Sequence, residues 1–323
     1  MILVTNNEGT VGAPTTARML ADGAHALDAI EAGIKLVEAD PAVRTVGRGG
    51  WPNLLGEVEL DSCLMDGTTL RTGAVGALKG FLHPVSVARE MMHRLPHEIL
   101  VGDGAARFAR EIGAETTENL TEDSRRAWQA WFENEVPEHD RSHWSTASLA
   151  DLCRHAIDPE TGRDTTVFLA HDSHGDICSG TSTSGWAWKY PGRLGDSPII
   201  GAGSYADTRY GAAACTGAGE MTIRCCTARS VVLYMKAGAT VRDAVMEAAE
   251  DMRHLKGGLI SRVTIHAIDA RGNHTVVAVN GAGDNRYWMW EEGDPAPRSL
   301  LAEPVVITSS APRETSTTRY TRG

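Results

Sequence analysis

The sequence lacks both an excess of positive charge and any long apolar run. Its 323 residues include 31 lysine and arginine side chains against 42 aspartate and glutamate side chains, a formal net charge of −11. An acidic chain has no general electrostatic attraction for phosphate backbones. A membrane-spanning helix needs about 20 consecutive apolar residues, and residues 1–7 lack the basic and apolar stretches of an export signal. We therefore expect a soluble, cytoplasmic protein that binds neither nucleic acid nor membrane.

Cysteine is also scarce, and none of the six cysteines belongs to a Cys-x-x-Cys pair. Neither a disulfide framework nor a thiolate metal site is therefore indicated. The content of 42% hydrophobic and 23% charged residues indicates a globular chain with a real core, for which we expect one domain. We expect the cysteines to be buried, reduced thiols: Cys63, Cys153, Cys178, Cys215, Cys225 and Cys226.

The first half of the chain alternates between short apolar runs and segments with helical periodicity. Leu27, Ile30, Ile34 and Val37 recur at three- and four-residue spacing, which indicates one apolar stripe that packs on a core. Glycine and proline separate the segments. The expected elements are a strand at 4–6, two helices within 14–40, strands at 57–65 and 70–78, a helix at 85–93, a strand at 99–101 and a helix at 105–112.

The second half begins with a polar stretch at 136–164, which we interpret as a long surface connection with a short helical piece at 149–155. At Thr165 the chain abruptly becomes β-branched and apolar. Strand and helix alternate in a way that suits a layered α/β domain. The expected elements are strands at 165–171 and 177–184, one long helix at 221–237, a helix at 241–255, strands at 263–268, 274–279 and 287–290, and a flexible tail at about 304–323.

Several short motifs do not support a function. The Gly-x-Gly segments at 201–203 and 217–219 fit no phosphate-binding frame. His93 and His97 have a proline between them, which disrupts the helix that paired metal-binding histidines need. The His and Asp residues at 171–176 suit a polar hairpin turn better than a cation site. Without a Gly-x-Ser-x-Gly elbow, an α/β-hydrolase triad has no nucleophile.

The densest group of residues able to carry chemistry lies between Thr165 and Gly219. Hydroxyl side chains fill 181–184, and Arg193 and Asp196 stand three apart in a glycine-rich loop. Such residues can supply a nucleophile, orienting hydroxyls and a charge pair that grips a zwitterion. They are equally typical of polar loops and turns.

At these residues the sequence resembles the glycosylasparaginase and type 2 asparaginase family of N-terminal nucleophile (Ntn) threonine hydrolases. The resembling segments are 26–33, 56–67, 180–185, 192–203 and 216–217. The resemblance implies a single domain built as a four-layer αββα sandwich. It also implies an N-terminal chain of 1–164, a C-terminal chain of 165–323 and a homodimer of cleaved protomers.

The resemblance implies that the precursor cuts itself between Asp164 and Thr165. Cleavage would give Thr165 a free α-amino group, whose ordinary pKa of about 7.7 to 8.0 suits a general base for its own hydroxyl. Thr183 would orient this nucleophile. Thr216 and the backbone N–H of Gly217 would stabilise the oxyanion.

By the same resemblance, Arg193 would bind a substrate α-carboxylate and Asp196 an α-ammonium. The implied reaction is hydrolysis of a β-aspartyl amide to aspartate and an amine or ammonia, with no cofactor and no metal. Three alternatives remain open at this point. The first is an isoaspartyl peptidase, the second is a specialised biosynthetic amide hydrolase, and the third is an unprocessed homologue that binds aspartyl compounds without catalysis.

The chain departs from the family's pattern at four places. Val167 replaces a glycine and Arg163 a histidine or glycine, and both lie at the cleavage junction. About Asn7, the family's glycosylasparaginases have an aromatic residue, and Trp51 replaces a small serine. We hypothesise that Trp51 lines a substrate-binding pocket for a different leaving group.

Overall fold

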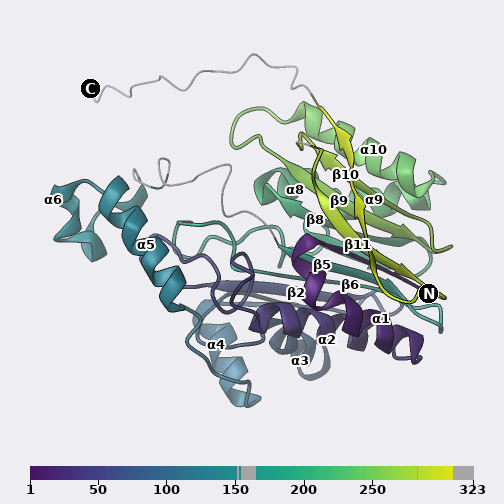
Figure 1. Ribbon diagram of the computed structural model, residues 1–323, viewed down its shortest axis with the longest axis horizontal. Coiled ribbons are helices and arrows are strands. Elements are labelled where there is room, and N and C mark those ends of the chain that lie inside the picture. The colour runs from purple at the N-terminus through teal and green to yellow at the C-terminus, as the bar shows by residue number, and fades with distance from the viewer. Residues whose placement is uncertain (151–152, 154–164, 282, 308–323) are drawn as a thin grey trace.

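The computed structural model describes residues 1–150, 153, 165–281 and 283–307. These residues fold around two β-sheets, shown in Figure 1. All neighbouring strands are antiparallel except β3/β4 and β10/β13. From edge to edge, the larger sheet contains β12 (Arg298–Leu301), β11 (Arg286–Glu291), β1 (Ile2–Asn6), β5 (Thr166–His171), β6 (Ile177–Thr183), β2 (Leu60–Asp66), β3 (Thr72–Leu78) and β4 (Ile99–Val101). The smaller contains β13 (Glu303–Val305), β10 (His274–Val279), β9 (Val263–Asp269), β8 (Gly211–Gly217) and β7 (Ser204–Asp207).

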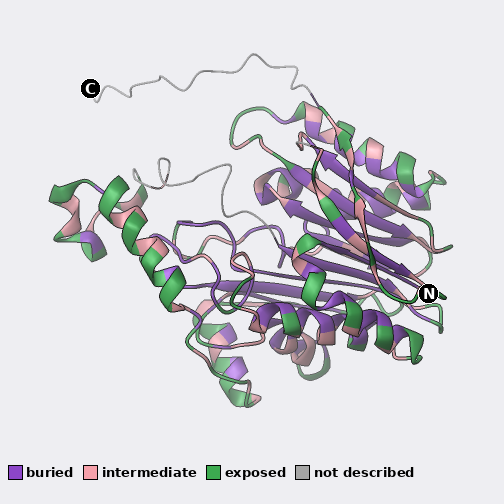
Figure 2. Cartoon of the chain, in the orientation of Figure 1, coloured by how far each residue is buried: buried purple, intermediate pink, exposed green. Residues whose placement is uncertain are grey.

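Helices cover the outer face of each sheet, and their buried sides point inward in Figure 2. A further group of helices lies to one side of the larger sheet (Figure 1). The larger sheet is covered by α1 (Ala13–Ala21), α2 (Ala26–Ala39), α3 (Pro84–Arg94) and α4 (Gly102–Glu111), and the smaller by α8 (Gly219–Cys225), α9 (Thr227–Lys236) and α10 (Val241–Asp251). The lateral group is α5 (Glu122–Glu135), α6 (Glu138–Arg141) and the 3₁₀ turn η2 (Trp144–Thr146), and two other 3₁₀ turns are η1 (Asn7–Val11) and η3 (Met252–His254).

The two sheets pack face to face through alternate residues of their central strands. Val167 and Leu169 of β5 belong to the same buried cluster as Ala212 and Ala214 of β8. Phe168 points the other way, into the cluster under α1 and α2. This alternation is the two-residue period of a strand with both faces covered. Because β5 is central and buried, the residue that precedes it is held at a defined place in the core.

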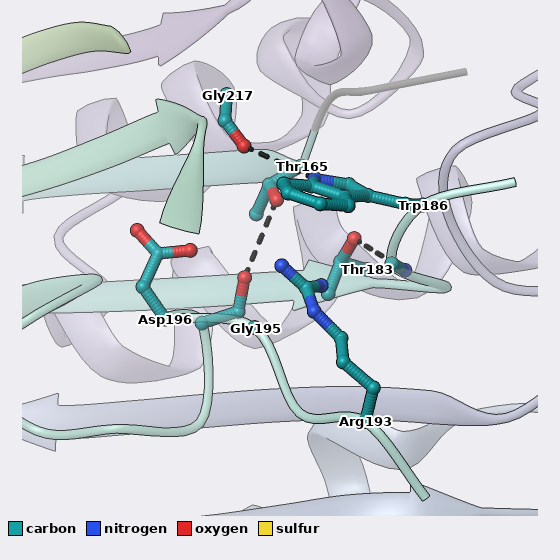
Figure 3. Close-up of a pocket in the computed structure, with 9 residues that line it drawn as sticks. Thr165, Thr183, Trp186, Arg193, Gly195, Asp196 and Gly217 are labelled. Atoms are coloured by element: carbon teal, nitrogen blue, oxygen red, sulfur yellow. Dashed lines mark hydrogen bonds between the residues drawn. The ribbon is translucent and has the colours of Figure 1, made fainter. Parts of the chain in front are cut away.

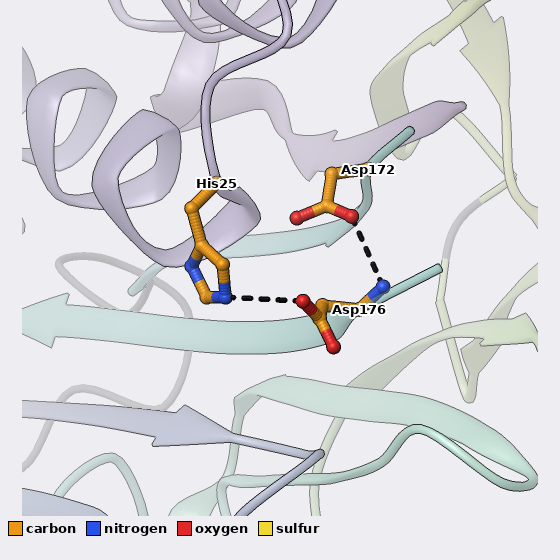
Figure 4. A group of neighbouring side chains, drawn as sticks. All are labelled: His25, Asp172 and Asp176. Atoms are coloured by element: carbon orange, nitrogen blue, oxygen red, sulfur yellow. Dashed lines mark hydrogen bonds and ion pairs between the residues drawn. The ribbon is translucent and has the colours of Figure 1, made fainter. Parts of the chain in front are cut away.

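The turn between β5 and β6 is tied to the start of α2 (Figure 4). Asp172 accepts the backbone N–H groups of Ala26, His174 and Asp176 at 2.8, 2.9 and 3.0 Å. His25 Nε2 lies 3.4 Å from Asp176 Oδ2. Protein donors thus occupy the Asp172 carboxylate, which agrees with the polar turn that we expect here. His25, Asp172 and Asp176 are, within the described residues, the one group of three His, Cys, Asp or Glu side chains close enough to share a cation.

The mixed α/β, single-domain expectation is confirmed, and each strand and helix expected in the first half is present. The stripe of Leu27, Ile30, Ile34 and Val37 is buried. No helix in the described part of the chain is long and apolar enough to cross a membrane. Most of the helical piece at 149–155, and the tail beyond residue 307, lie outside the described residues.

The single helix expected at 221–237 is wrong. Cys226 adopts a left-handed backbone conformation with φ of 48° and separates α8 from α9. This break turns the first N–H groups of α9 toward a neighbouring loop, where Ala228 and Arg229 donate to the carbonyls of Ala202 and Gly201. The first backbone N–H groups of α9 therefore find their hydrogen-bond acceptors in a distant loop instead of in a preceding helical turn.

Two smaller expectations also need correction. Cys226 is exposed and Cys153 and Cys225 are half-buried, so only Cys63, Cys178 and Cys215 are buried thiols among the six. Residues 304–305 are not part of a flexible tail, because β13 pairs in parallel with β10.

Candidate active site

Thr165 lies directly before β5 and is 5% exposed. The side chain of Asn6, at the end of β1, contacts the backbone on both sides of Thr166. Its Nδ2 donates to the Thr165 carbonyl at 2.5 Å, and its Oδ1 accepts the Val167 N–H at 3.1 Å. The hydroxyl of Thr165 lies 3.3 Å from Ser197 Oγ. The backbone of the candidate nucleophile is thus fixed, and its hydroxyl faces the glycine-rich loop.

A small pocket surrounds this hydroxyl (Figure 3). Its free volume is about 10 Å³, which is room for about one water molecule. The pocket brings together a strand end, a tryptophan, an arginine, an aspartate and three glycines from segments that are distant in sequence. Its lining residues are Thr165, Thr183, Gly185, Trp186, Arg193, Gly195, Asp196, Ser197 and Gly217.

Thr183 ends β6 beside Thr165. Thr166 pairs with Ser182 in the β5–β6 register, so the next residues outward on these antiparallel strands are Thr165 and Thr183. The Thr183 hydroxyl donates to the carbonyl of Thr45 at 3.2 Å and accepts the Gly185 N–H at 2.9 Å. Its position is therefore fixed by the backbone on both sides.

Asp196 is buried to 3% exposure. Thr222 donates its hydroxyl to Asp196 Oδ2 at 2.7 Å. Burial raises the pKa of Asp196 to about 6, while Thr222 and the nearby Arg193 guanidinium oppose this rise. The structure therefore holds a carboxyl group poised to ionise near neutral pH.

Arg193 forms a two-pronged ion pair with Glu220. Its Nη2 lies 2.8 and 2.9 Å from the two carboxylate oxygens, and its Nε lies 3.0 Å from one of them. The guanidinium also stacks 4.3 Å from the centre of the Trp186 ring. Figure 3 shows Trp186 beside Thr165, with Arg193 and Asp196 reaching in from the loop. The fork that would bind a substrate carboxylate thus already holds a protein carboxylate.

A buried lysine anchors the loop that carries Arg193. Lys189 Nζ donates to the Glu59 carbonyl at 3.1 Å and lies 4.0 Å from the Glu59 carboxylate. Both carboxylate oxygens of Glu59 accept the Gly192 N–H at 3.1 Å. Burial lowers the pKa of Lys189, and the charges of Asp61 and Glu59 oppose this effect. The loop is therefore tied to the start of β2 immediately before Arg193.

Thr216 and Gly217 lie at the end of β8. Gly217 has φ of 105°, and a Cβ at this residue would stand 2.5 Å from the Arg262 carbonyl, so the backbone requires glycine. The Gly217 carbonyl accepts the Trp186 indole N–H at 3.4 Å. Thr216 is 4% exposed and lies next to the pocket in sequence, but it is not one of the lining residues.

Trp51 is not among the lining residues either. It lies against the Trp188 ring, with ring centres 5.7 Å apart, and the Arg44 guanidinium covers it at 4.4 Å. Its backbone N–H donates at 3.1 Å to the hydroxyl of Ser184, which is the residue after Thr183. Asn7 is exposed.

We compared the sequence with known protein families and proteins. The model of the asparaginase family matches residues 11–295. The chain belongs to this asparaginase family. An N(4)-(beta-N-acetylglucosaminyl)-L-asparaginase of Elizabethkingia miricola is 38% identical over 250 residues, which cover 77% of this chain and 68% of the relative.

Two other asparaginase-family relatives carry different names. A plant-type L-asparaginase of Pyrococcus abyssi is 37% identical over 248 residues, covering 77% of this chain and 78% of the relative. An isoaspartyl peptidase/L-asparaginase of Mus musculus is 34% identical over 253 residues, covering 78% and 73%. The family resemblance and the hydrolase class that it implies are confirmed.

The structure adds residues to the candidate site that the sequence patterns did not single out. Ser197 directly follows the expected site residue Asp196, and Trp186 lies three residues after Thr183, so proximity in sequence was their one available signal. Glu220 and Asn6 carried no local signal, because their contacts with Arg193 and Thr165 are long-range. The junction residues Asp164 and Arg163 lie outside the described residues. Val167 packs between the two sheets.

Proposed function

We propose that this protein is an amidohydrolase, activated by its own cleavage, that hydrolyses β-aspartyl amides with Thr165 as N-terminal nucleophile. The proposal rests on one observation above the others: a single pocket contains Thr165, Thr183, Arg193, Asp196 and Gly217. Membership of the asparaginase family supports it. We also propose that the two sheets and their covering helices form the four-layer αββα sandwich of Ntn hydrolases, in a homodimer of cleaved protomers.

In the proposed activation, the Thr165 hydroxyl oxygen attacks the carbonyl carbon of Asp164. The peptide C–N bond breaks, the acyl group passes to the oxygen, and the nitrogen becomes the α-amino group of Thr165. Water then hydrolyses the ester to release the Asp164 carboxylate and restore the hydroxyl. Two chains result, 1–164 and 165–323.

In the proposed turnover, the α-amino group of Thr165 takes the proton of its own hydroxyl as the oxygen attacks the substrate's side-chain carbonyl. Thr216 Oγ and the Gly217 N–H stabilise the oxyanion. The proton passes to the leaving amine, and water hydrolyses the resulting ester to free aspartate. Asp196 binds the α-ammonium, and Arg193 exchanges Glu220 for the α-carboxylate.

The aspartyl half of the substrate is the part for which the pocket supplies partners. The relatives' names share this half and differ in the leaving group: a glycosylamine, ammonia or a peptide. Our proposal therefore covers the β-aspartyl amide class, within which isoaspartyl peptides and a specialised biosynthetic amide are alternatives. An unprocessed homologue that binds aspartyl compounds without catalysis is the remaining alternative.

Intact mass and N-terminal sequencing test the proposal directly. Wild-type protein is expected to give two chains, the second beginning Thr165-Thr166-Val167-Phe168, while Thr165→Ala stays whole. Cleaved protein is then assayed with L-asparagine, N4-N-acetylglucosaminyl-asparagine and a β-aspartyl dipeptide. An intact wild-type chain without turnover of any of the three would favour the binding protein.

A further inference from the structure

The side chain of Asn6 continues a strand ladder that the backbone leaves unfinished. β1 pairs with β5 from Ile2 opposite His171 to Thr5 opposite Phe168. Beyond this last pair, the Asn6 carboxamide bonds the Val167 N–H and the Thr165 carbonyl. One C=O and one N–H on the same planar group are what a peptide of the neighbouring strand would present.

The orientation of this carboxamide follows from its partners. Nδ2 donates to the Thr165 carbonyl at 2.5 Å and to Glu8 Oε2 at 2.8 Å, while Oδ1 faces the Val167 N–H at 3.1 Å. The flipped amide would set its oxygen against a carbonyl and a carboxylate, and its NH₂ against an N–H. Asn6 is 3% exposed, so water cannot readily replace these bonds.

We propose that Asn6 is a positioning residue that holds Thr165 for both cleavage and turnover, an inference that rests on the proposed role of Thr165. By fixing the backbone from Thr165 to Val167, the carboxamide directs the Thr165 hydroxyl toward Ser197 and the pocket. Reaction rates at such a centre fall steeply with misplacement, by about a hundredfold for 1 Å.

The position of Asn6 relative to the cleavage point strengthens the inference. Cleavage before Thr165 removes the covalent link on its N-terminal side. Both groups held by Asn6, the Thr165 carbonyl and the Val167 N–H, lie on the C-terminal side of that bond. Asn6 would therefore be a part of chain 1–164 that keeps its hold on the new N-terminal residue of chain 165–323 after cleavage.

The test compares Asn6→Ala with Asn119→Ala in the full chain. Asn119 is also buried, and its carboxamide likewise bridges two backbone groups, the Gly80 N–H at 3.1 Å and the Phe81 carbonyl at 3.0 Å, outside the pocket. Both variants should lose similar thermal stability, because each removes side-chain hydrogen bonds to two buried backbone groups. Asn6→Ala should slow self-cleavage, and lower kcat per cleaved chain, by about tenfold or more with little change in KM, whereas Asn119→Ala should do neither.

Asn6→Asp supplies a second readout. Ionised, its carboxylate faces the Thr165 carbonyl with an acceptor; protonated, it regains an O–H donor there. The rate of Asn6→Asp relative to wild type should therefore rise as pH falls from 8 to 5. Wild-type rates in cleaved Asn6→Ala, or a constant Asn6→Asp ratio across this pH range, would overturn the positioning role. Cleavage and turnover retained in Thr165→Ala would instead overturn the proposed function itself.

Discussion

At the residue scale, the pKa of Asp196 sets a pH dependence. The carboxyl must be ionised to bind an α-ammonium, and burial raises its pKa to about 6. As pH falls through this value, protonation removes the charge, so kcat/KM of the cleaved enzyme should fall about tenfold per pH unit, mostly through KM. A pH profile measures this. Because the raised pKa means that the folded protein favours the neutral carboxyl, Asp196 contributes to the free energy of unfolding at low pH. This contribution is lost as pH rises through about 6.

Asp196→Asn should remove this pH dependence and lower kcat/KM at pH 8 by about tenfold to a hundredfold, the value of a hydrogen bond to a charged group. Asp207→Asn is the matched control, because Asp207 is also 5% exposed or less but pairs with Arg209 outside the pocket. An unchanged profile in Asp196→Asn would show that another group binds the ammonium.

Glu220 should compete with the substrate for Arg193. The ion pair is partly exposed, so its loss corresponds to a modest free energy. Glu220→Gln should therefore lower KM by about two- to fivefold at unchanged kcat. Glu303→Gln removes a comparable pair with Arg242 outside the pocket and should leave KM unaltered. A higher KM in Glu220→Gln would mean that Glu220 orients the guanidinium instead of competing for it.

At the element scale, the loop before Arg193 depends on the buried Lys189–Glu59 pair. Lys189→Met leaves the Glu59 carboxylate buried and unpaired, which should cost about 3 to 5 kcal/mol of unfolding free energy. It should also raise KM, because the loop that carries Arg193 loses the contacts of Lys189 with Glu59. Urea unfolding of Thr165→Ala backgrounds measures the stability effect. Adding Glu59→Gln should restore part of it, since no buried charge remains; no restoration would contradict the pairing.

The helices and strands also show which parts of the fold the sequence patterns predict and which they do not. The α1–α2 pair, the β5–β6 hairpin and the grouping of Arg193 with Asp196 followed from local periodicity and glycine punctuation. β8 did not, because its glycines and alanines are weak strand formers, and they fit a strand that packs against β5 on one face and against helices on the other. α5 was overlooked although Thr121 caps it, and Trp128, Trp131 and Phe132 have helical spacing. The break at Cys226 had no local signal, since the contacts at the start of α9 are with the distant carbonyls of Gly201 and Ala202.

At the scale of the whole molecule, the two proposed chains interleave in one sheet. β1 of 1–164 lies between β11 and β5 of 165–323, and β6 of 165–323 pairs with β2 of 1–164. Separating the chains would therefore break three strand interfaces and expose the core beneath α1 and α2. No local pattern could show this arrangement, because it follows from the order of strands and not from any one of them.

We accordingly expect the two chains to stay associated after cleavage. Native size-exclusion chromatography should give one peak at the same volume for wild type and Thr165→Ala, while denaturing electrophoresis of that peak gives two bands only for wild type. Dissociation should require unfolding, so the chains should separate in urea at the concentration where the cleaved protein loses its far-UV circular dichroism. Free chain 165–323 under native conditions would contradict the interleaved sheet, since β5 would then lack its β1 neighbour and Thr165 its contact with Asn6.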